Sequence, residues 1–74
     1  MTLLQLSYLV KLGEMESFSK TSESLNISQP ALSLQISKLE EEIGMTLFKR
    51  TSTGVFATDE GQLFISKAQE LLQM

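Results

Sequence analysis

The link between two predicted helices constrains this chain more than any other feature. A short segment and a longer one both have helical patterns, and only Asn26 and Ile27 separate the first from the capping residue Ser28. Asparagine can take the left-handed conformation that ends a helix. Ser28 is a favourable N-cap, and Pro30 falls in the first turn, where its missing N–H is not needed. A short helix, a tight turn and a longer helix predict a helix-turn-helix over about residues 18–37.

The longer of these helices, expected over residues 29–43 and ended by Gly44, has one apolar face and one polar face. At about 100° per residue, the apolar face contains Leu32, Ile36, Leu39 and Ile43. Leu34 falls on the opposite, polar face. An isolated exposed leucine needs no explanation, but this side chain would also suit thymine methyl groups in a DNA major groove, or a protein partner. The sequence leaves these three interpretations open.

The neighbouring segments predict a first helix and a β-hairpin. Residues 2–12 have one apolar stripe and form a core-facing helix that Gly13 would end. Ser17 or Ser19 would cap the short second helix. The segment TLFKRTSTGVFAT has β-branched and aromatic residues on both sides of a turn. It predicts a small hairpin, or wing, over residues 47–57.

Thr58 would cap a final helix over residues 59–74. Its apolar positions are Phe64, Ile65, Ala68, Leu71 and Leu72. They would form either a core contact with the first helix or, as we favour, a dimer interface. The pattern continues to the last residue, so we expect a truncated helix. The predicted architecture is a mainly α winged helix-turn-helix domain over residues 1–58, with a three-helix core and a small β-hairpin wing, followed by a long linker or dimerisation helix.

Composition excludes several classes of function. The chain has 74 residues and contains neither histidine nor cysteine. A Ser-His-Asp triad, a thiol nucleophile and a histidine or thiolate metal site are therefore unavailable, and we expect no enzyme, no cofactor and no metal. No apolar run approaches the roughly 20 residues of a membrane span. The start also lacks a signal-peptide pattern, so we expect a soluble, cytoplasmic protein.

The net charge of −3 counts against nucleic-acid binding, which usually accompanies a high isoelectric point. The excess acid lies in the two outer segments, however, and residues 18–54 are neutral overall. The acidic residues 40–42 are expected to form a solvated surface in the second half of the long helix, where they would repel phosphate. DNA would then have to approach the first half of that helix.

A helix-turn-helix with a wing can place its second helix in a DNA major groove while the wing reaches the backbone. Gln29 and Gln35 would then pair with adenine, and Ser33 would donate to or accept from a base. Phosphate contacts are expected from the central basic residues Lys20, Lys38, Lys49 and Arg50. The simpler interpretation of each is a solvated polar side chain, or for Arg50 a salt bridge to an acidic residue of the same domain.

Three stretches together resemble a known family, namely SFSKTSESLNISQPALS, QISKLEEEIGMTLFKR and GVFATDEG, in that order. Over about residues 3–72 the chain is similar to the amino-terminal winged helix-turn-helix domain of LysR-type transcriptional regulators. The resemblance implies a bacterial or archaeal domain that binds double-stranded DNA sequence-specifically and dimerises through its final helix. It also implies a small-molecule effector, bound by a carboxy-terminal domain that is absent from this chain.

The resemblance assigns family roles to particular residues. It places Gln29, Pro30, Ala31 and Ser33 at the start of the recognition helix, Arg50 in the wing and Thr58 at a cap near the DNA backbone. The complete set expected at DNA is Lys20, Ser28, Gln29, Pro30, Ala31, Ser33, Leu34, Gln35, Lys38, Arg50 and Thr58.

The chain departs from the family pattern at several positions. Many members have arginine where this chain has Leu34, and a basic residue where it has Thr53; both changes remove positive charge from the expected DNA face. Thr21 and Ser22 replace a usual pair of alanines. The alternative function is a winged-helix protein-interaction or dimerisation module with weak or no DNA binding. Salt dependence separates the two functions, because phosphate contacts weaken steeply with salt and an apolar contact does not.

Overall fold

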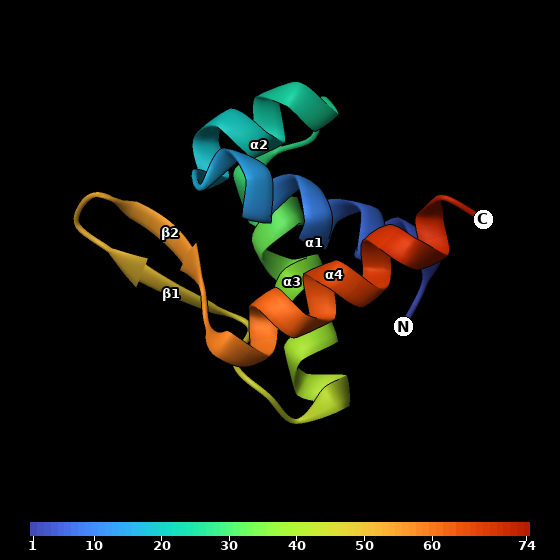
Figure 1. Cartoon of the computed structure of the whole chain (residues 1–74). Coiled ribbons are helices and arrows are strands. Elements are labelled where there is room, and N and C mark those ends of the chain that lie inside the picture. The colour runs from blue at the N-terminus through green and yellow to red at the C-terminus, as the bar shows by residue number, and fades with distance from the viewer.

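A computed structural model describes all 74 residues of the chain. The elements are α1 (Leu3–Met15), α2 (Phe18–Leu25), α3 (Gln29–Ile43), β1 (Phe48–Thr51), β2 (Gly54–Ala57) and α4 (Asp59–Leu72). Figure 1 shows the hairpin projecting from one side of the helices. The mainly α winged helix-turn-helix prediction is confirmed. None of the helices has the length and hydropathy that a membrane span needs.

Local capping sets most of the helix boundaries. The backbone N–H groups of Lys20, Ala31 and Gly61 donate to the hydroxyls of Ser17, Ser28 and Thr58 respectively. Left-handed residues end α2 and α3, with φ of 62° at Asn26 and 70° at Gly44. Ser17, rather than Ser19, is the cap of α2. These ends were predictable because each depends on residues within a few positions of one another.

The prediction that Gly13 ends the first helix is wrong. The helix continues to Met15, and Glu16 is the left-handed C-cap, with φ of 56°. Gly13 lies inside the helix where α4 crosses it. A Cβ added there would be 2.6 Å from Cδ1 of Ile65, so glycine at this position lets the two helices approach closely.

One hydrophobic core joins the helices and the wing. Its buried residues are Leu6, Leu9, Leu12, Leu32, Ile36, Leu39, Leu47, Phe48, Val55 and Ala68. The predicted apolar face of α3 supplies three of them, and Ile43 packs against the cluster. Burial of this kind is the main stabilising contribution in a small domain.

The wing is a two-stranded antiparallel hairpin fastened to the end of α1. Arg50 pairs with Val55 in the hairpin register. The N–H of Val55 also donates to the carbonyl O of Glu16, at 3.1 Å. Gly54 has φ of 153°, and an added Cβ would lie 2.7 Å from that same carbonyl. The turn end of the wing is therefore held against the junction between α1 and α2.

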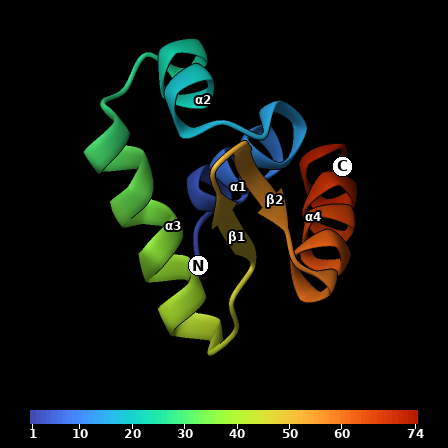
Figure 2. The same cartoon turned by 90° about the vertical axis from the view of Figure 1, so that its left-hand side faces the viewer.

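The first turn of α4 is tightly attached to the segment before β1. The Thr58 hydroxyl donates to the carbonyl O of Thr46 at 2.7 Å, and the Thr58 N–H donates to the carbonyl O of Leu47 at 2.9 Å. A Cβ on Gly61 would overlap the Leu47 carbonyl. In Figure 2, α3 and α4 lie on opposite sides of the wing.

The expectation that residues 40–42 form a solvated surface is wrong for one of the three. The Glu40 carboxylate accepts from the N–H of Leu47 at 2.7 Å and from the N–H of Phe48 at 3.2 Å. Glu42 forms an ion pair with the amino group of Met1. Of these three acids, only Glu41 is exposed and makes no hydrogen bond or ion pair of this kind. Folding brings β1 beside the end of α3, and this proximity cannot be seen in the sequence pattern.

Candidate nucleic-acid interface

The start of α3 presents an exposed polar surface. Ser28 caps the helix, and the next three residues, Gln29, Pro30 and Ala31, are all exposed. Leu34 follows on the same side and is 52% exposed. The sequence prediction that Leu34 lies on the polar face is confirmed. These side chains are free to contact a partner without any rearrangement of the core.

Arg50 extends from β1 to the helix-turn-helix. Its Nη2 donates to the Ser33 hydroxyl at 2.8 Å, and its guanidinium carbon lies 4.1 Å from the centroid of the Phe18 ring. The salt bridge considered from sequence is absent, since the only ion pair joins Met1 and Glu42. The positive charge of Arg50 is therefore not neutralised by any carboxylate of the domain.

Two other predicted DNA residues already have partners within the domain. The Gln35 amide oxygen accepts from Nε2 of Gln5 at 3.1 Å. Bidentate pairing with adenine needs that oxygen, so the adenine contact predicted for Gln35 requires this bond to break. The Thr58 hydroxyl caps α4 and donates to the Thr46 carbonyl. The geometry gives Thr58 a structural task, while its contact with DNA stays a prediction.

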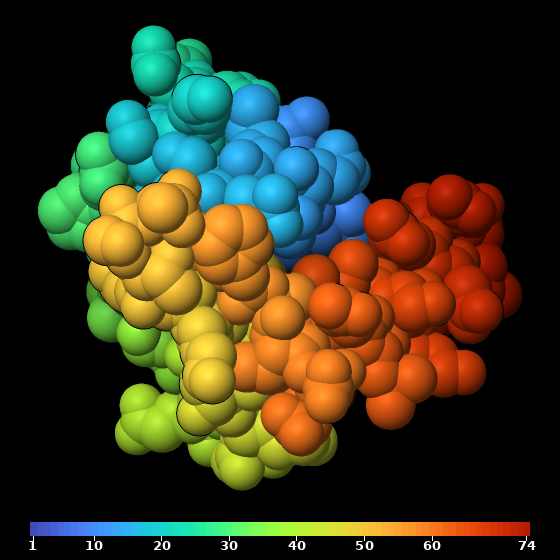
Figure 3. All heavy atoms as spheres, turned by 60° about the vertical axis from the view of Figure 1, so that its left-hand side comes forward, coloured from blue at the N-terminus to red at the C-terminus, as the bar shows by residue number.

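The four basic residues of the centre are only partly brought together. Lys20 and Arg50 line one groove of about 620 Å³ between the start of α2 and the wing. Figure 3 shows the yellow wing directly beside the cyan α2. Lys38 is exposed on α3. Lys49 instead lines a separate hollow with Asp59 and Glu60.

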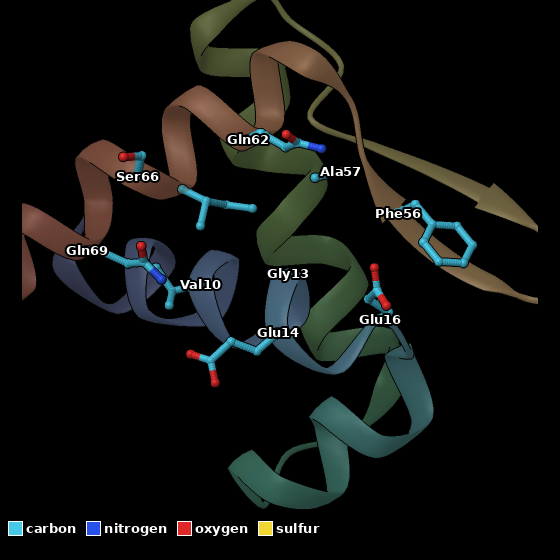
Figure 4. A pocket seen from close by; sticks show the side chains of 10 residues that line it. Val10, Gly13, Glu14, Glu16, Phe56, Ala57, Gln62, Ser66 and Gln69 are labelled. Atoms are coloured by element: carbon cyan, nitrogen blue, oxygen red, sulfur yellow. The ribbon is translucent and has the colours of Figure 1, made fainter.

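A second groove, of about 390 Å³, lies between α1, β2 and α4. Figure 4 looks into it, with Val10 and Gly13 of α1 on one side and Gln62 and Ser66 of α4 on the other. Its charged lining residues, Glu14 and Glu16, are both acidic. Negative charge disfavours phosphate, so this groove is not part of the candidate interface.

The predicted dimerisation residues divide between two environments. Ala68 is 1% exposed, and Phe64 and Ile65 are half-buried against the core of the same chain. Leu71 and Leu72 are exposed. Leu63, which lies off the predicted stripe, is 65% exposed. Helical spacing alone identifies apolar positions but does not distinguish a contact with α1 from a contact with a second chain.

Sequence reasoning missed the role of Phe18 at this surface. The Phe18 ring lies against the Arg50 guanidinium. Phe18 and Arg50 are separated in the sequence by the whole helix-turn-helix and the loop after it, so no local pattern connects them. The FKR run at β1 together with the aromatic at the start of α2 was the only available signal.

Together, a helix-turn-helix, an exposed start of α3 and a hairpin beside it define a winged helix-turn-helix domain. Residues 3–62 match the model of the family described as bacterial regulatory helix-turn-helix protein, lysR family. The chain belongs to this family.

Curated relatives and solved structures resemble nearly the whole chain. The hydrogen peroxide-inducible genes activator of Haemophilus influenzae is 44% identical over 73 residues, which cover 99% of this chain and 24% of that protein. The regulator TfdT of Cupriavidus pinatubonensis is 40% identical over 74 residues, covering 100% of this chain and 32% of that protein. The chain thus spans about a quarter to a third of the length of these relatives.

The structural matches are equally close. The crystal structure of the BenM DBD/benA site 1 DNA complex has a TM-score of 0.94 and 45% identity, covering 99% of this chain and 82% of that one. CbnR, a LysR family transcriptional regulator, has a TM-score of 0.95 and 29% identity, covering 99% of this chain and 25% of that one.

Proposed function

We propose that this domain binds double-stranded DNA sequence-specifically as the DNA-binding part of a transcriptional regulator, with α3 in the major groove and the wing against the backbone. The observation that carries the proposal is the unneutralised guanidinium of Arg50 beside the exposed start of α3. Base edges are read by the helix, and phosphates are contacted by the cations around it. The similarity to the BenM DBD in its DNA complex supports this placement.

The acidic net charge is a weaker objection than it appears from the sequence. The Glu40 carboxylate accepts a hydrogen bond from the segment before β1, and Glu42 forms an ion pair with the amino group of Met1. Glu14 and Glu16 line the groove between α1 and α4. The cations Lys20 and Arg50 share the groove beside α2, where Glu16 is the only acidic lining residue. Affinity for phosphate depends on this local distribution more than on the total charge.

The domain acts as a homodimer through α4 in this proposal. An apolar groove of about 360 Å³ lies along α4, with Leu63, Phe64 and Leu71 among its lining residues. The helix α4 itself lies on the opposite side of the wing from α3 (Figure 2). Exposed leucines at such a groove favour a second apolar surface. A two-fold dimer would present two copies of α3 to half-sites one helical turn of DNA, or a multiple of it, apart.

The remaining parts of the proposed function concern the longer protein. The chain covers 24% of the Haemophilus relative, so we infer a longer regulator in which a small-molecule effector binds a separate domain. Its place of action is the cytoplasm, where the DNA is. The contribution of the domain is recognition and not catalysis.

The proposal is tested by titrating the purified chain into random-sequence duplexes at two salt concentrations and sequencing the bound fraction. We expect an enriched motif with two related half-sites and a steep fall of affinity with salt. Gln29→Ala should lower discrimination at one base pair by roughly 1 to 3 kcal/mol, and Arg50→Ala should weaken binding to all sequences about equally. Gln69→Ala and Lys11→Ala are the matched controls outside this surface. Equal losses on specific and random DNA for Gln29→Ala would contradict base reading by that residue.

The second candidate function is a protein-interaction module, and the exposure of Leu34 favours it. A contact built on this leucine would be nearly insensitive to salt. A folded, dimeric chain that enriches no sequence at either salt concentration would support this candidate and defeat the first.

A further inference from the structure

The guanidinium of Arg50 is contacted from two helices although the residue itself is on the wing. Ser33 comes from α3 and accepts from Nη2 at 2.8 Å. Phe18 comes from the first turn of α2, and its ring centroid is 4.1 Å from the guanidinium carbon. The three residues therefore join the wing to both helices of the helix-turn-helix.

These contacts hold the side chain without using up its binding capacity. A guanidinium has five N–H donors, and only one hydrogen bond within the domain involves them. The phenyl ring covers one face of the group and makes no hydrogen bond. No carboxylate competes for the remaining donors. Phe18, Lys20 and Arg50 line the open groove between α2 and the wing together with one acid, Glu16. The two cations outnumber this acid, so the groove is net positive and leaves space for an anion.

We propose that Phe18 and Ser33 are positioning residues that hold Arg50 in the conformation in which it contacts a DNA phosphate. The inference rests on the DNA-binding function proposed above. Arginine is long and has many rotamers, and fixing such a side chain on binding opposes association. A side chain already held by a ring and a hydroxyl has lost that freedom before DNA arrives. Ser33 consequently acts through Arg50.

The experiment is a set of double-mutant cycles on the 74-residue chain, measured as binding to a selected duplex over a series of salt concentrations. Ser33→Ala removes the acceptor and Phe18→Leu removes the ring while keeping an apolar side chain. Each is made in the wild-type chain and in Arg50→Ala. Ser33→Thr and Phe18→Tyr restore the hydroxyl and the ring. Ser66→Ala on α4 and Tyr8→Leu on α1, whose ring also packs partly buried against the core, are the matched controls.

We expect Ser33→Ala and Phe18→Leu each to weaken binding by about threefold to tenfold in the wild-type chain. Neither should weaken it further in Arg50→Ala, and the two restoring variants should bind as the wild type does. A loss that persists in Arg50→Ala would overturn the inference, because it would reflect a direct DNA contact of Ser33 or a structural role of Phe18. Unchanged affinity in both variants would overturn it too, while leaving the proposed function intact.

A measurement without DNA separates positioning from binding. Nitrogen-15 relaxation of the Arg50 Nε–H group in the free chain reports its motion on the picosecond to nanosecond timescale. We expect an ordered group in the wild type and a mobile one in Ser33→Ala and Phe18→Leu. A group that is already mobile in the wild type would overturn the inference. Absence of any DNA binding by the wild-type chain would overturn the proposed function and this inference together.

Discussion

The hydroxyl of Thr21 is the one buried side-chain polar atom of the domain that has no hydrogen-bond partner. The residue is fully buried in α2, next to Ser22, whose hydroxyl donates to the carbonyl O of Ser19 at 3.0 Å. Both positions are alanine in many members of the family that the sequence resembles. An unpaired hydroxyl in an apolar site loses its hydration without compensation. Thr21 therefore lowers the stability of the helix-turn-helix.

Replacing this hydroxyl with a methyl group should stabilise the domain. Thr21→Val keeps the shape of the side chain and removes the unpaired oxygen, so we expect the free energy of unfolding to rise by about 1 kcal/mol. Chemical denaturation measures the change, and Thr46→Val at an exposed position is the control. A fall in stability for Thr21→Val would mean that the hydroxyl has a partner in solution.

At the scale of elements, the connection from α3 to β1 depends on one carboxylate. Glu40 accepts from two backbone N–H groups of buried residues, Leu47 and Phe48. The neighbouring Glu41 is exposed and makes no such contact. Neighbouring acids in the sequence therefore have different roles. Glu40 holds the segment that leads into the wing, and Glu41 is solvated.

Glu40→Ala should lower the free energy of unfolding by about 2 kcal/mol, because it leaves two buried N–H groups without an acceptor. Glu41→Ala removes the same charge from the next position and should change stability by less than about 0.5 kcal/mol. Thermal or chemical unfolding of the two variants gives the comparison. Similar values for both would show that the net charge, and not the hydrogen bonds, determines the effect.

For the whole molecule, the distribution of charge decides how the domain meets DNA. The net charge is −3, yet the exposed start of α3 carries no acid, and Arg50 beside it is unneutralised. Leu34 lies on this surface. Many members of the family that the sequence resembles have arginine at this position. An apolar side chain there lowers the number of phosphates that the domain can neutralise and suits a thymine methyl group.

Leu34→Arg should therefore increase DNA affinity and steepen the salt dependence by about 0.9 in the logarithmic slope for each phosphate gained. It should also remove a thymine from the selected half-site if the leucine contacts a methyl group. Gln69→Arg adds the same charge on α4, away from α3, and is the control. Equal effects of the two variants would indicate that only total charge matters and that DNA does not approach α3.

Local signals predicted the elements, whereas contacts between distant segments did not appear in the sequence. Caps such as Ser28 and Asn26 act within one turn and were identified correctly. Gly13 looked like a helix end because its actual constraint, the approach of α4, comes from far along the chain. The contacts of Arg50 with α2 and α3 could not be predicted from the sequence for the same reason. Exposure of α3 at its start followed from its period, since one face had to be buried.

The attachment of α4 at Gly61 has a mechanical consequence. The Leu47 carbonyl fills the space beside Gly61, and Thr58 is bonded to the segment before β1 on the preceding turn. These contacts oppose bending at the base of α4, so we expect the helix to move together with the part of the domain that carries α3. A rotation of α4 would therefore also change the orientation of the recognition helix α3. In a dimer built on this helix, the packing of the two α4 helices against each other would set the angle between the two domains.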